Sequence, residues 1–340
     1  MKKSLIALAV LGSVAGMAQA QSSVTLYGLA DVWVGSTKTE VNGVGSSVTK
    51  LDGNGVATSR FGLKGSEDLG GGLKANFQLE QGFNIDNGTA GNSTGTAASQ
   101  AFDRQAWVGL SGGFGEVQFG KTWSSYDDIR SSANDSFNAN VAASFNTWVG
   151  YTDRPVNSIK YLSPTVGGFS GSVTYGLGED KLANANGKSS SLTSLGLQYA
   201  NGPVFVGLAY QAEKDGATDT KFTNTLINGS YDFGMAKLVG GYNQAKDTSI
   251  PGDGKAKEWN LGVEVPVAAN LNFGLGYAQS KISAAGTDVA KVSGYTASLL
   301  YSLSKRTTVY GVLSQTKAKD IPFTTEGKDT LYAVGINHKF

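Results

Sequence analysis

Hydrophobic and polar residues alternate with a period of two along nearly the whole chain. In VTLYGLADVWV, residues 24–34, Val24, Leu26 and Val34 share one face, and Asp31 lies on the other. The stretch GLKANFQLE, residues 72–80, alternates in the same way. A period of two places successive side chains on opposite faces of a β-strand. About 16 such segments follow one another and no helical period is found after residue 20, so the chain is predicted to be all-β.

Short turns rich in Gly, Asp and Asn alternate with long polar loops between these segments. The first two segments are expected at 22–36 and 56–68, with a loop at 37–55 between them, and the longest strand-free stretch is about 123–152. Short turns at one end and long loops at the other describe an up-and-down antiparallel meander. Strands of about 10–13 residues, tilted by about 45°, cover the apolar band of an outer membrane, which is about 25 Å tall. The pattern therefore predicts a transmembrane β-barrel of 16 strands.

Soluble β architectures agree less well with the pattern. A β-sandwich has strands of about 5–6 residues, and a β-solenoid shows a fixed repeat, which is not found in this sequence. Tyr and Trp recur near segment ends, as aromatic girdles at membrane interfaces require. The last strand, TLYAVGINHKF, ends at Phe340, like the terminal signal of outer-membrane barrels, and His338 is expected on the wall rather than as a ligand.

The first twenty residues, MKKSLIALAVLGSVAGMAQA, have the features of a secretory signal peptide. Two lysines precede an apolar run, and Ala18-Gln19-Ala20 is a small-x-small cleavage site. The run is shorter than the roughly 18 apolar residues of a membrane-spanning helix. Residues 1–20 are therefore expected to be removed, which leaves residues 21–340 as a single barrel domain exported to the Gram-negative outer membrane.

Composition excludes several kinds of function. The formal net charge is +1, so nucleic acid is not an expected partner. The chain has no cysteine and one histidine, so thiolate and multi-histidine metal sites are excluded and no cofactor is expected. No G-x-S-x-G nucleophile turn is found, and the chain is not expected to be an enzyme.

One motif suggests a different chemistry. GEVQFGKT, residues 115–122, matches the phosphate-binding pattern G-x-x-x-x-G-K-[ST]. Such a loop must follow a strand and open a helix, whereas residues 116–119 alternate and are themselves predicted strand. The motif is interpreted as a barrel strand that leads into the long segment 123–152.

Several stretches together resemble the general trimeric porins of Gram-negative outer membranes, in their β-proteobacterial branch. They are SSVTLYGLAD, SRFGLKGSEDLGGGLKANFQLEQGF, RQAWVGLSGGFGEVQFGK, RPVNSIKYLSPTVGGFSGSVTYG and AVGINHKF. The resemblance implies a water-filled pore for passive diffusion of small hydrophilic solutes and inorganic ions. It also implies a homotrimer surrounded by outer-membrane lipid and lipopolysaccharide, and a third long loop, here about 123–152, that folds inward and narrows the pore.

Strand parity assigns basic side chains to the lumen. An arginine at the lipid midplane costs about 2–4 kcal/mol, so the inner face is the favourable side. Phe61 and Leu63 outward put Arg60 and Lys64 inward, and Trp107 outward puts Arg104 inward. Ile159 and Tyr161 outward put Lys160 and, along the same strand, Arg154 inward. The resemblance places Arg60, Arg104 and Arg154 at the pore constriction, opposed by a wall glutamate, here Glu80. Ordinary lumen-facing charge is the alternative interpretation.

The acidic side of the constriction is expected on the long segment. Asp127 and Asp128 lie near its start, and Asp135-Ser136-Phe137 resembles an Asp-Pro-Phe of the family, from which Ser136 departs. Three arginines against these carboxylates predict weak to moderate anion preference. The alternative is a channel that prefers anionic phosphate or carboxylate solutes, for which Lys64 and Lys160 would supply extra positive charge.

Overall fold

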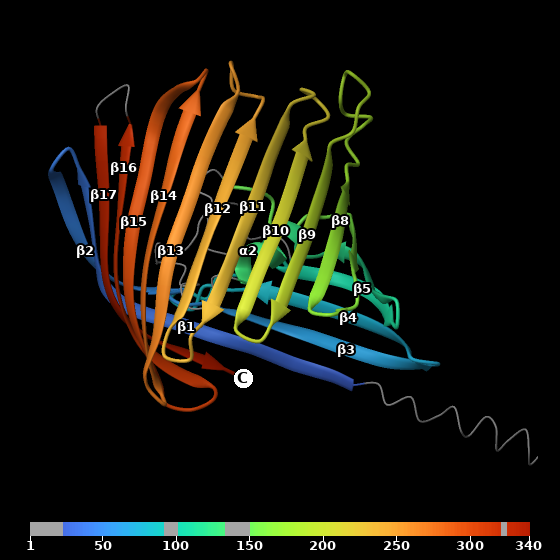
Figure 1. Ribbon diagram of the computed structural model, residues 1–340, viewed down its shortest axis with the longest axis horizontal. Coiled ribbons are helices and arrows are strands. Elements are labelled where there is room, and N and C mark those ends of the chain that lie inside the picture. The colour runs from blue at the N-terminus through green and yellow to red at the C-terminus, as the bar shows by residue number, and fades with distance from the viewer. Residues whose placement is uncertain (1–22, 92–100, 133–149, 321–324) are drawn as a thin grey trace, which may run out of the picture.

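The protein folds into one closed antiparallel barrel (Figure 1). The computed structural model describes residues 23–91, 101–132, 150–320 and 325–340; the predicted signal peptide lies outside them. The elements are β1 (Ser23–Val41), β2 (Val44–Gly53), β3 (Arg60–Gly70), β4 (Leu73–Gly82), β5 (Gln105–Gly112), β6 (Gly115–Lys121), α2 (Ser125–Ser132), β7 (Ser158–Leu162), β8 (Phe169–Leu177), β9 (Ser191–Asn201), β10 (Val204–Lys214), β11 (Lys221–Asp232), β12 (Lys237–Asp247), β13 (Gly254–Ala268), β14 (Leu271–Ala284), β15 (Thr287–Ser302), β16 (Thr307–Asp320) and β17 (Thr325–Lys339). Because β2 and β3 pair with successive parts of β1, they together form one barrel strand, and the barrel has 16 strands as predicted.

The first and last strands close the barrel. β1 pairs with β17 from Leu29↔Lys339 to Val41↔Gly327. The backbones of Gly28 and Phe340 exchange two hydrogen bonds of 3.0 and 3.1 Å. A Cβ on Gly28 would lie 2.4 Å from the Phe340 ring, so glycine is required for the terminal aromatic to lie against the wall. Closure leaves no unpaired sheet edge between the two termini.

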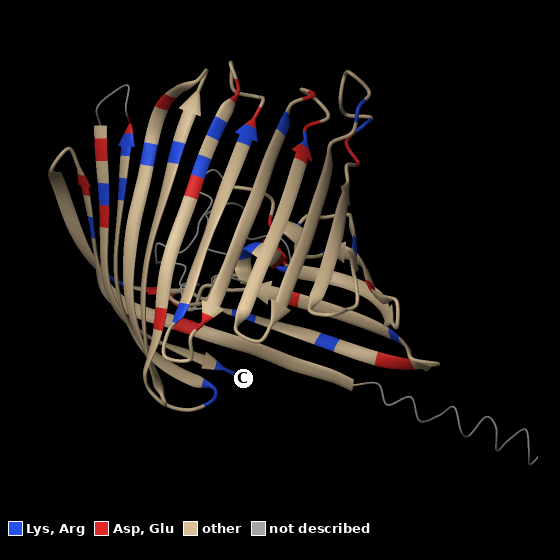
Figure 2. Ribbon diagram, viewed as in Figure 1, with Lys and Arg blue, Asp and Glu red and all other residues tan. Residues whose placement is uncertain are grey.

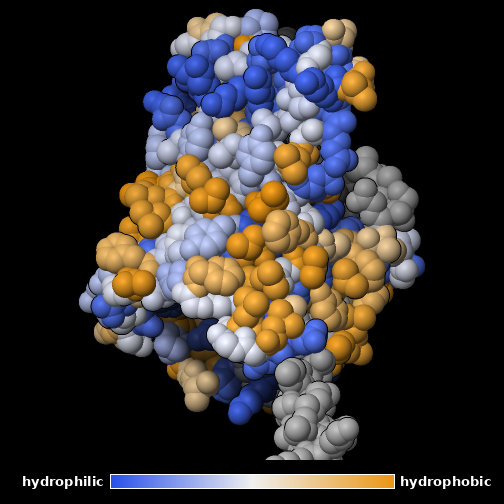
Figure 3. All heavy atoms as spheres, turned by 90° about the vertical axis from the view of Figure 1, so that its right-hand side faces the viewer, coloured by the Kyte–Doolittle hydropathy of each residue, from blue (hydrophilic) through white to orange (hydrophobic). Residues whose placement is uncertain are grey.

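The wall is apolar outside and polar inside, which confirms the predicted alternation. On β13, Trp259 and Leu261 are exposed on the outer face, whereas Glu258 and Asn260, which alternate with them, are buried. Figure 3 shows the outer face as an apolar belt bordered by hydrophilic surface above and below. Among the described residues, no helix is long and apolar enough to cross a membrane. Strands that hydrogen-bond all around the barrel satisfy their own backbone groups within lipid.

The prediction of a loop at 37–55 is wrong, because most of this region forms a β-hairpin. β1 continues to Val41, and β2 begins at Val44 after a two-residue turn. Asn42 and Gly43 have φ values of 50° and 82°, which suit the left-handed positions of a tight hairpin turn. Asn-Gly between alternating segments is a strong hairpin signal that the sequence interpretation overlooked.

Two segments extend from the wall into the barrel. Six residues, 54–59, separate β2 from β3, but only two residues of β1, Ala30 and Asp31, lie opposite them. The segment is therefore too long to stay within the sheet. The helix α2 lies on the opposite inner wall (Figure 1) and hydrogen-bonds to side chains of β8, β9, β11 and β12. Its presence corrects the expectation that no helix follows residue 20.

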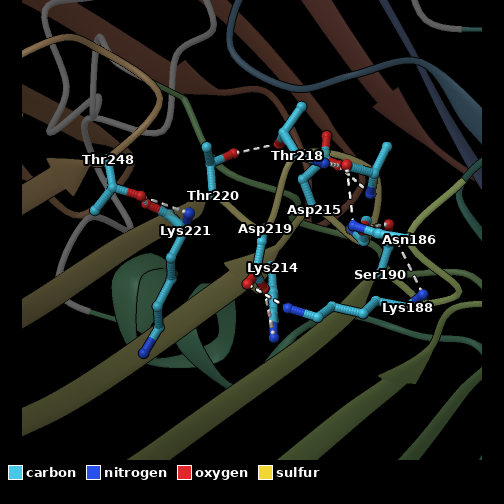
Figure 4. A network of polar contacts seen from close by, with 12 residues as sticks. Asn186, Lys188, Ser190, Lys214, Asp215, Thr218, Asp219, Thr220, Lys221 and Thr248 are labelled. Atoms are coloured by element: carbon cyan, nitrogen blue, oxygen red, sulfur yellow. Dashed lines mark hydrogen bonds and ion pairs between the residues drawn. The ribbon is translucent and has the colours of Figure 1, made fainter. Parts of the chain in front are cut away.

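The loops before β9 and between β10 and β11 are joined by polar contacts (Figure 4). The Asp219 carboxylate forms ion pairs with the ammonium groups of Lys188 and Lys214, at 2.5 and 2.9 Å. Hydrogen bonds from these two ammonium groups lower the pKa of Asp219 to about 2. Asn186 donates to the carbonyl of Gly216 at 2.6 Å. The contacts give this part of the barrel mouth a defined shape above the strands.

Candidate pore constriction

Two of the predicted arginines meet the predicted glutamate on the inner wall. Arg104 Nε lies 2.7 Å from Glu80 Oε1, and Arg60 Nε lies 3.6 Å from Glu80 Oε2. Glu80 is inward on β4, Arg60 begins β3, and Arg104 immediately precedes β5. One carboxylate on β4 therefore holds a guanidinium group from each side of that strand, which partly neutralises both.

The third arginine joins them through an aromatic ring. The guanidinium carbon of Arg154 lies 3.6 Å from the centre of the Trp123 ring, and that of Arg104 lies 5.6 Å from it. Arg154 also contacts Asp153 at 2.6 Å. Burial lowers the pKa of Arg154 from its usual range, but an arginine remains protonated. Trp123 thus keeps two like charges close together through cation–π contacts.

The outward assignment of Trp107 is wrong. Val108 and Leu110 are the exposed residues of β5, so Trp107 lies on the inner side, where its Nε1 donates to Gln105 at 3.3 Å. Arg104 nevertheless reaches Glu80 because it precedes the strand and is free of the strand's alternation. The parity argument placed Arg104 correctly for a wrong reason.

Lys64 lies further along the inner wall from these arginines. Its Nζ is 5.3 Å from the centre of the Tyr27 ring. The Tyr27 hydroxyl donates to Glu80 Oε2 at 2.9 Å and accepts from Gln78 at 2.6 Å. Lys64 is therefore connected to the arginine group through Tyr27 and not by direct contact with a carboxylate.

A buried carboxylate, Asp31, holds the inserted segment 54–59 in place. Asp31 is fully buried, and its two oxygens accept five hydrogen bonds. The donors are the backbone N–H groups of Gly55, Val56 and Ala57, the Tyr310 hydroxyl and the Asn337 amide. A Cβ on Gly55 would lie 2.0 Å from the Tyr310 hydroxyl, so only glycine fits there.

The segment that Asp31 holds supports Arg60 in turn. Arg60 Nη1 donates to the carbonyl of Thr58 at 2.9 Å. Ser59 is also fixed, since its hydroxyl hydrogen-bonds the backbone of Asp31 at 3.0 and 3.2 Å. Arg60 therefore has two fixed partners, Glu80 on the wall and the carbonyl of Thr58 on the inserted segment.

The helix α2 begins with a capping residue. The Ser124 hydroxyl accepts from the Asp127 backbone N–H at 3.1 Å, which satisfies a free donor of the first turn. Asp127 and Asp128 lie in that first turn and Arg130 in the last, the order that the helix dipole favours. The features of the sequence that favour this helix are the capping Ser124 and the charges of its first and last turns, rather than an apolar face.

Neutral side chains of the wall hold α2 in place. Thr174 and Ser194 accept from the backbone N–H groups of Ser125 and Tyr126 at 3.1 and 2.8 Å. Asn228 donates to the carbonyl of Ile129 at 2.7 Å. In addition, the Tyr126 hydroxyl donates to Asn243 at 2.9 Å. Four strands therefore position this short helix inside the barrel.

Two of the three acidic residues predicted on the long segment, Asp127 and Asp128, lie on α2 and contact basic side chains. Asp127 accepts a short hydrogen bond from the Tyr151 hydroxyl and lies 3.8 Å from Arg130. Burial raises the pKa of Asp127 to about 6, against the opposing effect of Arg130. Asp128 contacts Lys160 at 2.5 Å, and Lys160 is itself buried. Asp135 lies outside the described residues.

Three residues of this region were not singled out from the sequence. Asp31 was assigned to the inner face without a role, and Trp123 and Tyr151 were treated as loop residues. Asp31 could have been found as an acidic residue at an inward position of an otherwise apolar strand, which must be hydrogen-bonded when buried. Nothing in the sequence reveals the partners of Trp123 and Tyr151, because they depend on the path of the long segment.

Comparisons with known proteins agree with this geometry. A family model described as Gram-negative porin matches residues 7–321. The chain belongs to the Gram-negative porin family. This porin is 35% identical to outer membrane porin protein 32 of Delftia acidovorans, over 99% of this chain and 95% of that protein. It is 31% identical to an outer membrane porin protein of Bordetella pertussis, over the full length of both chains.

Solved structures support the same family. The anion-selective porin from Comamonas acidovorans superposes with a TM-score of 0.78 at 32% identity, covering 94% of this chain and 100% of that one. OmpT of Vibrio cholerae, in its trimer form, shares the fold with a TM-score of 0.64 at 15% identity, covering 94% and 99%. This porin is therefore a channel protein of the Gram-negative outer membrane.

Proposed function

We propose that this porin is a diffusion pore with weak to moderate anion preference, set by Arg60, Arg104 and Arg154. The observation that carries the proposal is the grouping of these three side chains around Glu80 and Trp123. Among the described residues, Glu80 and Asp153 are the carboxylates in contact with them, which leaves a surplus of one positive charge within this group. The anion selectivity named for the porin from Comamonas acidovorans supports the same sign.

Only a moderate preference is expected. A monovalent anion about 5 Å from one unit charge in water gains roughly 0.8 kcal/mol. The neighbouring carboxylates cancel part of the gain from three arginines, and salt screens more of it. Asp127 and Asp128 add little cation attraction, since each contacts a cation of its own, Arg130 and Lys160. The resulting field favours anions without excluding cations.

The assembly follows the family resemblance. We expect a homotrimer in contact with outer-membrane lipid and lipopolysaccharide, which passes inorganic ions and small hydrophilic solutes. A channel that prefers anionic phosphate or carboxylate solutes is the second candidate, and Lys64, which contacts no carboxylate among the described residues, favours it. Lys160 does not favour it, since Asp128 occupies its ammonium group.

Reversal potentials in a KCl gradient across a planar bilayer test the proposal. The wild type should show a chloride-selective potential, and Arg104→Ser should lower the anion/cation permeability ratio about two- to fourfold, the effect of one unit charge at this distance. Arg306→Ser, in the turn between β15 and β16, is the matched control and should leave the ratio unchanged. Cation preference of the wild type would refute the proposal. Competition of the chloride current by phosphate would favour the second candidate.

A further inference from the structure

The strands of the wall that lie against α2 are almost without charge. In β8, β9 and β10, two residues are charged, Glu213 and Lys214 at the end of β10. Figure 2 shows these strands mainly in tan, in contrast to the charged residues of α2 inside the barrel. Glu213 shares the inward parity of the buried Gln211, so its carboxylate lies on the lumen side. A lone carboxylate on this neutral wall opposes an anion preference unless it has another role.

Glu213 holds one residue of the segment that leads into β7. Its Oε1 accepts from the backbone N–H of Thr152 at 2.8 Å, and its Oε2 accepts from the Thr152 hydroxyl at 2.5 Å. The Gln211 amide donates to the Thr152 carbonyl at 2.9 Å and to Glu213 Oε1 at 2.8 Å. The neighbouring Lys214 forms its ion pair with Asp219 in the loop. All the polar groups of Thr152 are therefore bonded to two side chains of β10.

The residues that follow Thr152 reach the arginines of the pore. Residues 150–157 form neither a helix nor a strand, so no continuous ladder of backbone hydrogen bonds fixes their path. The carbonyl of Asp153 accepts from the backbone N–H of Ser124 at 2.8 Å, and Arg154 comes next in the chain. The backbone then joins the sheet at the start of β7. Arg154 therefore lies between two fixed points, Thr152 on β10 and the first residue of β7.

We infer that Glu213 is a positioning residue for the ion selectivity of this pore. By holding Thr152, it keeps Arg154, two residues further along the chain, against the ring of Trp123. The inference rests on the proposed anion preference and gives Glu213 an effect opposite to that of its charge. A carboxylate that acts only through its charge attracts cations into a pore. A carboxylate that holds an arginine in place favours anions.

Two substitutions of Glu213 separate these effects in reversal potentials of the full mature porin in a KCl gradient. Glu213→Met has a similar length but no carboxylate to accept from Thr152. We expect it to lower the anion/cation permeability ratio about 1.5- to twofold, the loss when one unit charge moves from about 5 to about 8 Å from the ion. Glu213→Gln also loses the charge, but its amide can still hydrogen-bond Thr152. Its ratio should equal or exceed that of the wild type.

A double-mutant comparison tests whether Glu213 acts through Arg154. In an Arg154→Ser background, Glu213→Met should no longer lower the ratio, because the side chain that it positions is gone. Thr152→Val removes the donor hydroxyl without changing any charge and should lower the ratio in the same direction as Glu213→Met, by a smaller factor. Glu179→Gln, which removes one carboxylate from the loop between β8 and β9, is the control and should not lower the ratio.

The outcomes distinguish this inference from the proposed function. A rise of the ratio in both Glu213→Met and Glu213→Gln would overturn the inference, because it would mean that the carboxylate acts only through its charge. A fall in the Arg154→Ser background as large as that in the wild-type background would also overturn it. The proposed function is decided separately by the sign of the wild-type reversal potential. Single-channel currents of each variant show that it has formed a pore, and Thr152→Val gives a second measurement of the same contact.

Discussion

The two segments that extend into the barrel are held in different ways. Segment 54–59 depends on one buried carboxylate, Asp31, which alone accepts five hydrogen bonds. The helix α2 depends on hydroxyl and amide groups from four strands, each of which makes one or two bonds, and on the ion pair between Asp128 and Lys160 of β7. A single anchor concentrates the stabilisation at one point, whereas several separate anchors spread it. The first arrangement should fail at one substitution, and the second should weaken gradually.

Asp31→Ala should have the largest effect. It leaves three backbone N–H groups, the Tyr310 hydroxyl and the Asn337 amide without their acceptor. Buried donors without partners cost about 1–3 kcal/mol each, so the free energy of unfolding should fall by about 3 kcal/mol or more. Urea unfolding of the barrel in lipid vesicles measures the change. Asp31→Asn keeps one acceptor oxygen and should lose less; equal midpoints for Asp31→Ala and wild type would contradict the single-anchor interpretation.

Ser194→Ala should have a smaller effect on the same measurement. It removes the acceptor of the Tyr126 backbone N–H, while Thr174, Asn228 and Asn243 still hold α2. One lost hydrogen bond should lower the free energy of unfolding by about 1 kcal/mol. Ser230→Ala serves as the control, because Ser230 lies near the C-terminal end of β11, beyond the residue that contacts α2. A loss as large as that of Asp31→Ala would mean that α2 also depends on one anchor.

Trp123→Ala should change selectivity more than stability. Arg154 and Arg104 lose the ring between them, and each such cation–π contact contributes about 0.5–1 kcal/mol. Repulsion should then separate the two guanidinium groups, and the anion/cation permeability ratio should fall about twofold. Trp123→Phe retains an aromatic face and should keep most of the ratio. If the alanine variant keeps the wild-type reversal potential, the ring does not position these arginines.

Asp127 should produce the smallest effect, a pH dependence near neutrality. Its pKa is raised to about 6, so the carboxyl group is mainly charged at pH 7 and mainly neutral at pH 5. Loss of this negative charge leaves Arg130 uncompensated, and the anion preference should rise as the pH falls from 7 to 5, by less than about twofold. Asp127→Asn should remove the step. A preference that falls over this pH range would have the wrong sign for this assignment.

The sequence predicts the wall better than the segments inside it. Alternation along stretches such as 254–268 reports a local property, the side of the sheet, and the structure agrees there. The path of segment 54–59 depends on Asp31, Tyr310 and Asn337, which come from opposite ends of the chain. No local pattern reports such contacts. Arg104 illustrates the limit, since its place beside Glu80 depends on a bend before β5 and not on parity.

Trp107 and the 37–55 region show two further causes of error. Trp107 was placed outward because aromatic residues are common in membrane girdles, yet the exposed neighbours Val108 and Leu110 define the outer face of β5. The 37–55 region was treated as a loop because it is polar, although polar strands are expected where a barrel wall extends beyond the lipid. In both cases residue type was given more weight than the alternation of the neighbouring residues.

The Asp31 contacts also determine when the pore is completed during folding. Its partners Tyr310 and Asn337 are 279 and 306 residues away in the chain, among the largest separations possible in this protein. Contacts between residues so far apart in the sequence form late, because a long loop must close before they are made. The full set of contacts around segment 54–59, and with it the support of Arg60, is therefore completed only after the first and last strands have joined. A barrel that is still open at this seam lacks part of its ion filter, so selectivity is acquired in the final step of assembly.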